Sequence, residues 1–171
     1  MEILITAAVL GIASGMGYPT IAAFIQEQRL NSSAQSLVAY LQGARARAER
    51  LATNNATCQL SVSGTTIGPT AISNNICSDL ESLNLAQPAS MGLTVTMDLY
   101  PITFNRAGTL AAEVLVGSTP SVTVAYVTAM PRMIYLSASG TQQQRCVFLD
   151  MISIRLGWRT GNSGVCSYAS F

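Results

Sequence analysis

The first 25 residues are the part of the sequence that most limits what this chain can fold into. A single carboxylate, Glu2, stands at the head of Ile3–Ile25, a run of 23 residues without a formal charge. As an α-helix this run would extend about 35 Å, which is enough to cross the hydrocarbon core of a bilayer. A secretory signal peptide fits poorly, because it would carry a basic segment before a shorter apolar stretch. A plain membrane anchor explains the length of the run but not Glu2.

The position of Glu2 indicates a partner outside the segment. An ionisable side chain at a membrane helix is usually paired and functional. Because Ile3–Ile25 contains no Arg or Lys, we expect Glu2 to meet an amine such as the N-terminal amine of a neighbouring copy. The alternative is that Glu2 lies in headgroup water without a partner.

Weak helix formers gather in the middle of the apolar run. Gly11, Gly15 and Gly17 each cost about 1 kcal/mol of helix stability, and Pro19 costs about 3 kcal/mol. Either Gly11 and Gly15 form a close helix–helix packing face, or the segment from Gly11 to Pro19 unwinds where other protein covers it. The two interpretations are compatible, since a helix packed among copies can unwind locally.

Beyond Pro19 the helical pattern continues but becomes one-sided. Apolar residues recur at steps of three and four, which predicts one apolar face over about six turns: Leu30, Ala34, Leu37, Leu41, Ala44, Ala48 and Leu51. We therefore expect one continuous helix from about residue 2 to about residue 53. It would be a hydrophobic transmembrane or filament-core helix over residues 1–25 and an amphipathic continuation over residues 26–55.

The basic cluster Arg45–Arg50 lies on this second part of the helix. It contains one acid, Glu49, four residues after Arg45, and no interleaved aromatic residue. This pattern favours a solvated or intersubunit helix face over a nucleic-acid site.

Residues 56–171 are predicted to form a β-rich globular head. Short β-like runs alternate with turn residues, and the predicted strands are Thr57–Val62, Leu93–Leu99, Ile102–Phe104, Glu113–Val116, Ser121–Val127, Met133–Ser137, Cys146–Asp150 and Ser153–Leu156. Residues 64–84 are expected to be an irregular loop tied down by Cys77. A long helix packed on an antiparallel sheet is an α+β arrangement.

Composition excludes several kinds of chemistry. Charged residues make up only 10 %, the net charge is +1, and there is no histidine and no lysine. Bulk electrostatic binding of nucleic acid is therefore not indicated. Without histidine, Ser-His-Asp or Cys-His catalysis is impossible within the chain. We expect no enzyme activity, no catalytic residues, no metal site and no cofactor.

The four cysteines allow three disulfide connectivities, which the sequence cannot distinguish. We favour the sequence-local pairs Cys58–Cys77 and Cys146–Cys166, each of which would contribute roughly 3 kcal/mol by closing a loop of about 20 residues. The alternative is four buried free thiols. Disulfides would place the head outside the reducing cytosol.

The N-terminal segment resembles the type IV pilins and pseudopilins. The match lies in Glu2-Ile-Leu-Ile-Thr-Ala-Ala-Val-Leu-Gly11-Ile-Ala and in Tyr18-Pro19, with the family's distance from glutamate to proline. A looser resemblance to the GspH/FimT branch lies in Gly43-Ala-Arg-Ala-Arg-Ala-Glu-Arg50 and Ile102-Thr-Phe-Asn-Arg-Ala-Gly-Thr109.

The resemblance implies a filament subunit. A prepilin peptidase would remove a leader, the new N-terminus is often methylated, and the subunit would wait in the inner membrane. An assembly platform would then move it into a helical homopolymer, alone or with other pilins, at the cell surface. There Glu2 would neutralise a neighbour's N-terminal amine, and Gly11 to Pro19 would lose helicity. Such filaments serve adhesion, motility, DNA uptake or secretion.

Two departures from the family pattern affect the finer assignments. Only Met1 precedes Glu2 here, so we assign neither cleavage nor methylation to Met1. DNA-uptake pilins of the FimT type carry Gly-Arg-x-Arg, which the segment Arg155-Leu-Gly-Trp-Arg159 matches only in part. Arg155 and Arg159 are weak DNA-contact candidates, and an ordinary late strand is the alternative. A minor pseudopilin of a type II secretion system, in a periplasmic filament, is the other alternative function.

Overall fold

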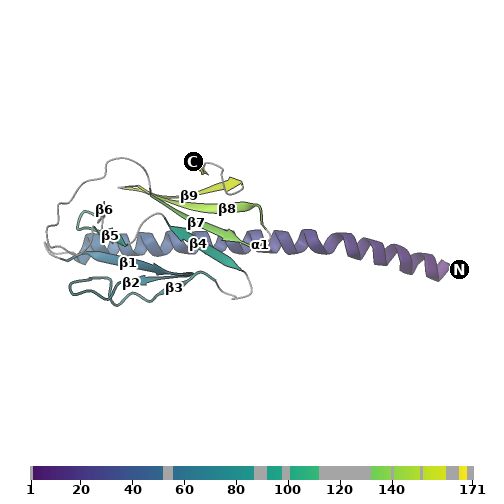
Figure 1. Cartoon of the computed structure of the whole chain (residues 1–171), viewed down its shortest axis with the longest axis horizontal. Coiled ribbons are helices and arrows are strands. Elements are labelled where there is room, and N and C mark those ends of the chain that lie inside the picture. The colour runs from purple at the N-terminus through teal and green to yellow at the C-terminus, as the bar shows by residue number, and fades with distance from the viewer. Residues whose placement is uncertain are drawn as a thin grey trace.

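The computed structural model describes residues 2–51, 56–86, 92–97, 101–111, 132–139, 141–150, 152–160 and 166–168, without the side chains of residues 2–20, 97, 111 and 168. One helix, α1 (Glu2–Leu51), runs the length of the molecule in Figure 1. Its 50 residues correspond to about 75 Å. The continuous helix is confirmed to Leu51, and the predicted last two residues of that helix lie outside the described residues.

Within the described residues the strands form two antiparallel sheets. The first has the order β3-β2-β1-β5-β6 and comprises β1 (Cys58–Ser63), β2 (Thr66–Pro69), β3 (Leu83–Asn84), β5 (Ile102–Phe104) and β6 (Leu110–Ala111). The second has the order β10-β9-β8-β7-β4 and comprises β4 (Leu93–Met97), β7 (Arg132–Ala138), β8 (Gln143–Leu149), β9 (Ile154–Thr160) and β10 (Ser167–Tyr168).

The two sheets wrap the C-terminal half of α1 and leave its N-terminal half projecting. In Figure 1, β1–β3 lie along one flank of the helix and β7–β9 along the other. We call residues 2–29 of α1 the stem, and residues 30–51 together with the sheets the head. The end of the head that adjoins the stem is the neck, and the opposite end, where α1 finishes, is the distal end.

The predicted apolar stripe of α1 forms the centre of one hydrophobic core. Six of its seven members are completely buried, namely Leu30, Ala34, Leu37, Leu41, Ala44 and Ala48. They pack with apolar residues of both sheets, including Leu60, Ile67, Ile134, Leu136 and Val147. Leu51 differs from the prediction because it remains 51 % exposed, one turn beyond the covered part of the stripe. Burying such side chains at roughly 25 cal/mol per Å² holds the helix to the sheets.

Both disulfides connect the cysteines as the sequence-local pairing predicts, and no cysteine is free. Cys58–Cys77 is fully buried beside α1, where the Cys77 Sγ lies 3.9 Å from the Ala44 carbonyl oxygen. Cys146 and Cys166 belong to a separate cluster with Phe148, Met133 and Tyr135.

The prediction that residues 64–84 form one irregular loop is wrong. β2 and β3 lie inside it, because Thr66–Pro69 pairs with β1 and then with Leu83–Asn84. The remaining turn is organised by Asn75, which has a positive φ of 71°. Its buried amide accepts from the Gln59 and Cys77 backbone N–H groups and donates to the Gln59 and Thr70 carbonyls. Cys77 ties this turn to β1, as expected.

Most other predicted strands have counterparts with shifted ends. β1, β4, β5, β7 and β8 fall where strands are predicted, while β9 extends to Thr160, four residues beyond its predicted end. Trp158 and Arg159 therefore lie in a late strand. The predicted strands Glu113–Val116 and Ser121–Val127 lie outside the described residues. An α+β fold with one helix on antiparallel sheets is confirmed.

Candidate functional site

The stem carries the residues to which the sequence assigns an assembly role. Glu2, Gly11, Gly15, Gly17 and Pro19 all lie in the unbroken backbone helix of α1. Their side chains lie outside the description, so their packing and the pairing of Glu2 stay predictions. Within the described residues, no helix is both long and apolar enough to span a membrane.

Large apolar side chains are exposed where α1 approaches the head. Ile21 and Phe24 are each 61 % exposed and Ile25 is 43 % exposed. Residues spaced i, i+3 and i+4 lie on one helix face. At about 100° per residue, this face is roughly opposite to the buried stripe that begins at Leu30. We call Ile21, Phe24 and Ile25 the back ridge, because it faces away from the sheets.

Within the head, the side of α1 that faces away from the sheets carries small side chains. They recur at steps of four and three, and all are exposed except the half-buried Ala46: Ser32, Ser36, Ala39, Gly43 and Ala46. We call these residues the small-residue face. Gly43 is mid-helix, where glycine is about 1 kcal/mol less favourable than alanine. A Cβ at Gly43 would meet nothing within 4 Å, so packing within the chain does not require this glycine.

An ion pair joins the stem to the neck. The Arg145 Nη2 of β8 lies 3.6 Å from Glu27 Oε1, and the Glu27 side chain remains 40 % exposed. Trp158 of β9 lies opposite Arg145 in the antiparallel ladder and is 43 % exposed. Glu27 is thus a loosely held carboxylate, open to a further partner.

The distal end of the head holds the basic cluster of α1. Arg45 Nε lies 3.1 Å from Glu49 Oε1, and Arg45 also donates to the Ile152 carbonyl. Arg47 donates to the Ile76 carbonyl at 3.2 Å and pairs with Asp79. Two of the three arginines of the cluster are thus bound within the head, and whether the cluster is a solvated or an intersubunit face stays a prediction.

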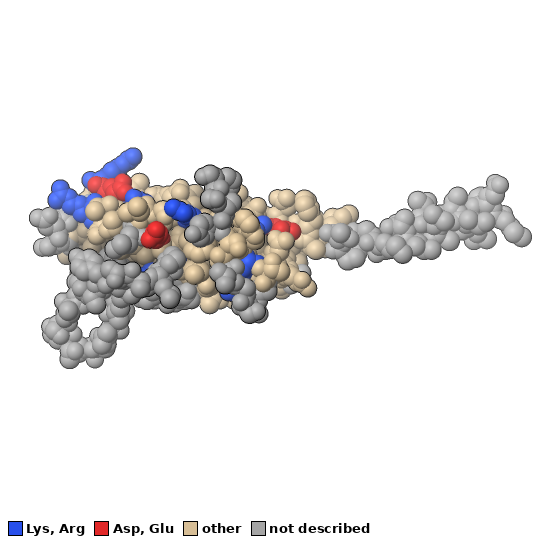
Figure 2. Space-filling view, turned by 90° about the horizontal axis from the view of Figure 1, so that it is seen from above, with Lys and Arg blue, Asp and Glu red and all other residues tan. Residues whose placement is uncertain are grey.

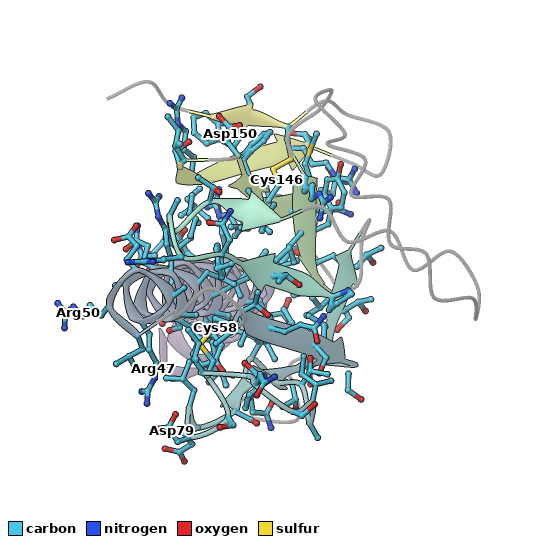
Figure 3. The ribbon with its side chains drawn as sticks, turned by 90° about the vertical axis from the view of Figure 1, so that its left-hand side faces the viewer. Arg47, Arg50, Cys58, Asp79, Cys146 and Asp150 are labelled. Carbon is cyan, nitrogen blue, oxygen red and sulfur yellow. A yellow bond between two sulfur atoms is a disulfide. The ribbon has the colours of Figure 1, made fainter. Side chains whose placement is uncertain are left out.

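Arg50 is the exception in this cluster. It is exposed and makes no hydrogen bond or ion pair with any described residue. Figure 3, a view onto the distal end, shows Arg50 pointing away from the strands, on the side of the helix opposite to the sheets. Figure 2 shows few charged side chains on the face drawn there, most of them toward the distal end.

The segment from Ile102 to Thr109 packs its turn against α1. The Asn105 side-chain oxygen accepts from the Ala107 and Thr109 backbone N–H groups at 3.0 Å. Gly108 has a positive φ of 65°, and a Cβ there would lie 2.1 Å from Glu49 Oε1. The turn needs glycine both for its backbone conformation and for this close approach.

The two DNA-contact candidates lie on the outer face of the second sheet. Arg155 pairs in register with Phe148, and Arg159 with Gln144. The Arg159 guanidinium lies 4.0 Å from the Tyr135 ring centroid, and its Nε donates to Gln144 Oε1 at 2.5 Å. The structure therefore places both arginines on one face but engages Arg159 within the sheet.

The described residues contain no group of acidic or cysteine side chains that could hold a metal ion. Burial perturbs Tyr40 of α1, where desolvation raises the pKa of the phenol above its usual value. Its hydroxyl is buried without a hydrogen-bond partner among the described residues.

Sequence reasoning missed four features of these surfaces. The back ridge and the small-residue face could have been predicted from the sequence, because their residues are spaced three and four apart on the side of the helix opposite the buried apolar stripe. The Glu27–Arg145 pair was not readable, because it joins residues far apart in the chain. The exposure of Trp158 likewise depends on where the sheet ends relative to the helix.

Comparison with known proteins identifies no relative. No protein-family model matches the chain, and no curated protein and no solved structure is significantly similar to it.

Proposed function

We propose that this chain is a structural subunit of a type IV pilus-like extracellular filament that polymerises through its stem. The observation that carries the proposal is the back ridge: three large apolar side chains stand exposed on a helix that continues into a folded head. Exposed apolar clusters on a soluble surface mark sites that another molecule covers. The N-terminal motif from Glu2 to Pro19 supports the same assignment.

The proposed mechanism assigns a separate task to each part of the chain. The stem would lie in the inner membrane before assembly and in the filament core afterwards, with Glu2 neutralising the N-terminal amine of an adjacent copy. The head, with its two disulfides, would face outward. An assembly platform and a prepilin peptidase are the implied partners, and no cofactor is required.

Sheared surface filaments from the native cells test this proposal. They would be imaged, and their subunits identified by mass spectrometry. We expect this chain among the filament subunits, as the dominant peptide for a major pilin or as a trace for a minor one. Its absence from the sheared fraction, together with retention in the cell envelope, would contradict the surface filament and favour a pseudopilin of a type II secretion system.

DNA uptake is a second candidate, carried by Arg155 and Arg159 on one face of β9. Arg155→Ala with Arg159→Ala should abolish DNA retention if that face binds the phosphate backbone. Because Arg159 also stacks on Tyr135, Tyr135→Leu is a matched control for loss of local packing. Unchanged DNA binding in the arginine variant would remove this candidate.

A further inference from the structure

We propose that the back ridge of one copy packs on the small-residue face of a second copy, in parallel orientation. This inference rests on the proposed function, because it names the contact that the polymer would use at the neck. The two surfaces belong to the same side of α1 but to different halves of the helix. A contact between different patches of identical chains builds either a closed ring or an open helical filament, and a shift along the helix axis from one copy to the next gives the filament.

The first step of the argument is the shape of the two surfaces. Ile21, Phe24 and Ile25 project from the back of the stem with 43–61 % of their surface exposed. Ser32, Ser36, Ala39, Gly43 and Ala46 leave the back of the head-bound helix with almost no side-chain bulk. Small residues at such spacing let another helix approach closely, and the bulky ridge is the shape that would occupy this face.

The second step concerns Gly43, which weakens the helix. A side chain at this position would enter open space, since no atom lies within 4 Å of its Cβ. The fold of a single copy therefore gives no reason for glycine here. A contact from outside the chain supplies one, because only glycine leaves room for a large side chain such as Phe24.

The third step is charge, which selects the orientation. Setting Phe24 of one copy against Gly43 of the next, in parallel, is a shift of 19 residues or about 28 Å. Glu27 then lies level with Ala46 of the next copy, one helical turn from its Arg50. Glu27 is 40 % exposed in its loose pair with Arg145, and Arg50 has no described partner. Opposite charges so placed fix the register of an interface.

The antiparallel arrangement lacks this complementarity. With Phe24 again at Gly43, Glu27 would lie level with Tyr40, ten residues or nearly three helical turns from Arg50. The arginine nearest along the helix would be Arg45, which is already paired with Glu49. Neither the back ridge nor the small-residue face carries a charge of its own. The Glu27–Arg50 pair is therefore what distinguishes the two orientations.

The first experiment uses Gly43→Leu in the full chain, produced in the native cells. The expected result is an unchanged or raised melting temperature, because leucine favours helix over glycine, with about tenfold less of the variant in sheared filaments. Ala71→Leu, which places a leucine at another exposed position, on the loop after β2, is the matched control and should enter filaments as the wild type does.

The second experiment exchanges the charges of the proposed pair. Glu27→Arg alone should reduce incorporation several-fold, and Arg50→Glu in the same chain should restore it to within about twofold of wild type. Loss of the Glu27–Arg145 contact within one head cannot explain such a recovery, because Arg50 does not contact Glu27 in the same copy. Recovery in the double variant therefore supports a contact between copies.

Four results would overturn the inference. Normal incorporation of Gly43→Leu, or failure of Arg50→Glu to rescue Glu27→Arg, would contradict the proposed contact. If the wild-type chain still enters filaments in those experiments, the proposed function is unaffected. A filament fraction without even the wild-type chain would remove both. A photo-crosslinker at Phe24 that labels only lipid in assembled filaments would show that the ridge meets membrane and not a second copy.

Discussion

From Leu30 to Ala48, α1 buries every member of its apolar stripe completely, whereas Ile21 and Phe24, within three turns of Leu30, each expose 61 % of their surface. The two regions belong to one unbroken helix, and both carry large apolar side chains. They differ in what lies around them, since both sheets pack on the second half only. Helix pattern alone therefore does not tell which apolar residues stabilise the fold.

The comparison separates folding from assembly along one element. Removing apolar surface from the head-bound half should destabilise the isolated chain, because those side chains complete the core. Removing it from the stem should leave the head intact and affect only contacts with other molecules. The predictions below test this division, beginning with the largest expected change in stability.

Leu41→Ala should have the largest effect. Leu41 is completely buried in the core between α1 and the sheets, and truncating such a leucine costs about 2–5 kcal/mol of unfolding free energy. Denaturant unfolding of the full chain in detergent measures the loss. A change below about 1 kcal/mol would show that the sheets do not hold this half of the helix.

Replacing both Cys58 and Cys77 with alanine should cost about 3 kcal/mol in the chain-entropy model. This bridge lies against Ala44 of α1, so amide hydrogen exchange should also rise in the helix around that residue. The paired control, Cys146→Ala with Cys166→Ala, opens a loop of nearly equal length in the cluster outside the main core. Equal amide hydrogen exchange of α1 in the two double variants would contradict a specific role of the Cys58–Cys77 disulfide in holding the helix.

Tyr40→Phe should raise stability by about 1 kcal/mol, because it removes a buried hydroxyl without a described partner. Burial raises the pKa of Tyr40 in the folded chain. A raised pKa favours the neutral phenol, so its contribution to stability is present below about pH 10 and falls as the pH rises through the folded value. The free energy of unfolding should fall less between pH 8 and pH 11 in Tyr40→Phe than in the wild-type chain. An identical fall in both chains would contradict the burial of the Tyr40 phenol as the cause.

Phe24→Ala should change the unfolding free energy by less than about 0.5 kcal/mol, since the side chain is mostly exposed. The same substitution should reduce filament incorporation, because it removes the centre of the back ridge. The two measurements on one variant sharpen the comparison. A loss of head stability as large as that of Leu41→Ala would erase the distinction between the two halves.

The sequence predicted the features that depend on local periodicity. The stripe from Leu30 to Ala48 was readable because a helix repeats every 3.6 residues, and burial followed that period. The same rule applied to the opposite side would have revealed Phe24 and Gly43. Sequence-local disulfides were favoured by spacing alone and proved correct.

The remaining features depend on contacts distant in the chain. β2 and β3 were missed because such short strands exist only through pairing, β2 with β1 and β3 with β2, and because Asn75 satisfies the backbone of the turn between them. Leu51 was assigned to the apolar stripe, but it lies beyond the part of α1 that buries this stripe. The Glu27–Arg145 pair joins α1 to β8, two elements that lie far apart in the sequence, so no local pattern predicts it.

The most direct test of the central claim measures Glu2→Ala against a co-expressed wild-type chain. Quantitative mass spectrometry would compare the two in the membrane and in sheared filaments. We predict equal amounts in the membrane, an intact head with both disulfides, and at least about tenfold depletion of the variant from filaments, as expected for loss of one partner of a buried charge pair. Equal incorporation of the two chains would contradict assembly through the Glu2 end of the stem.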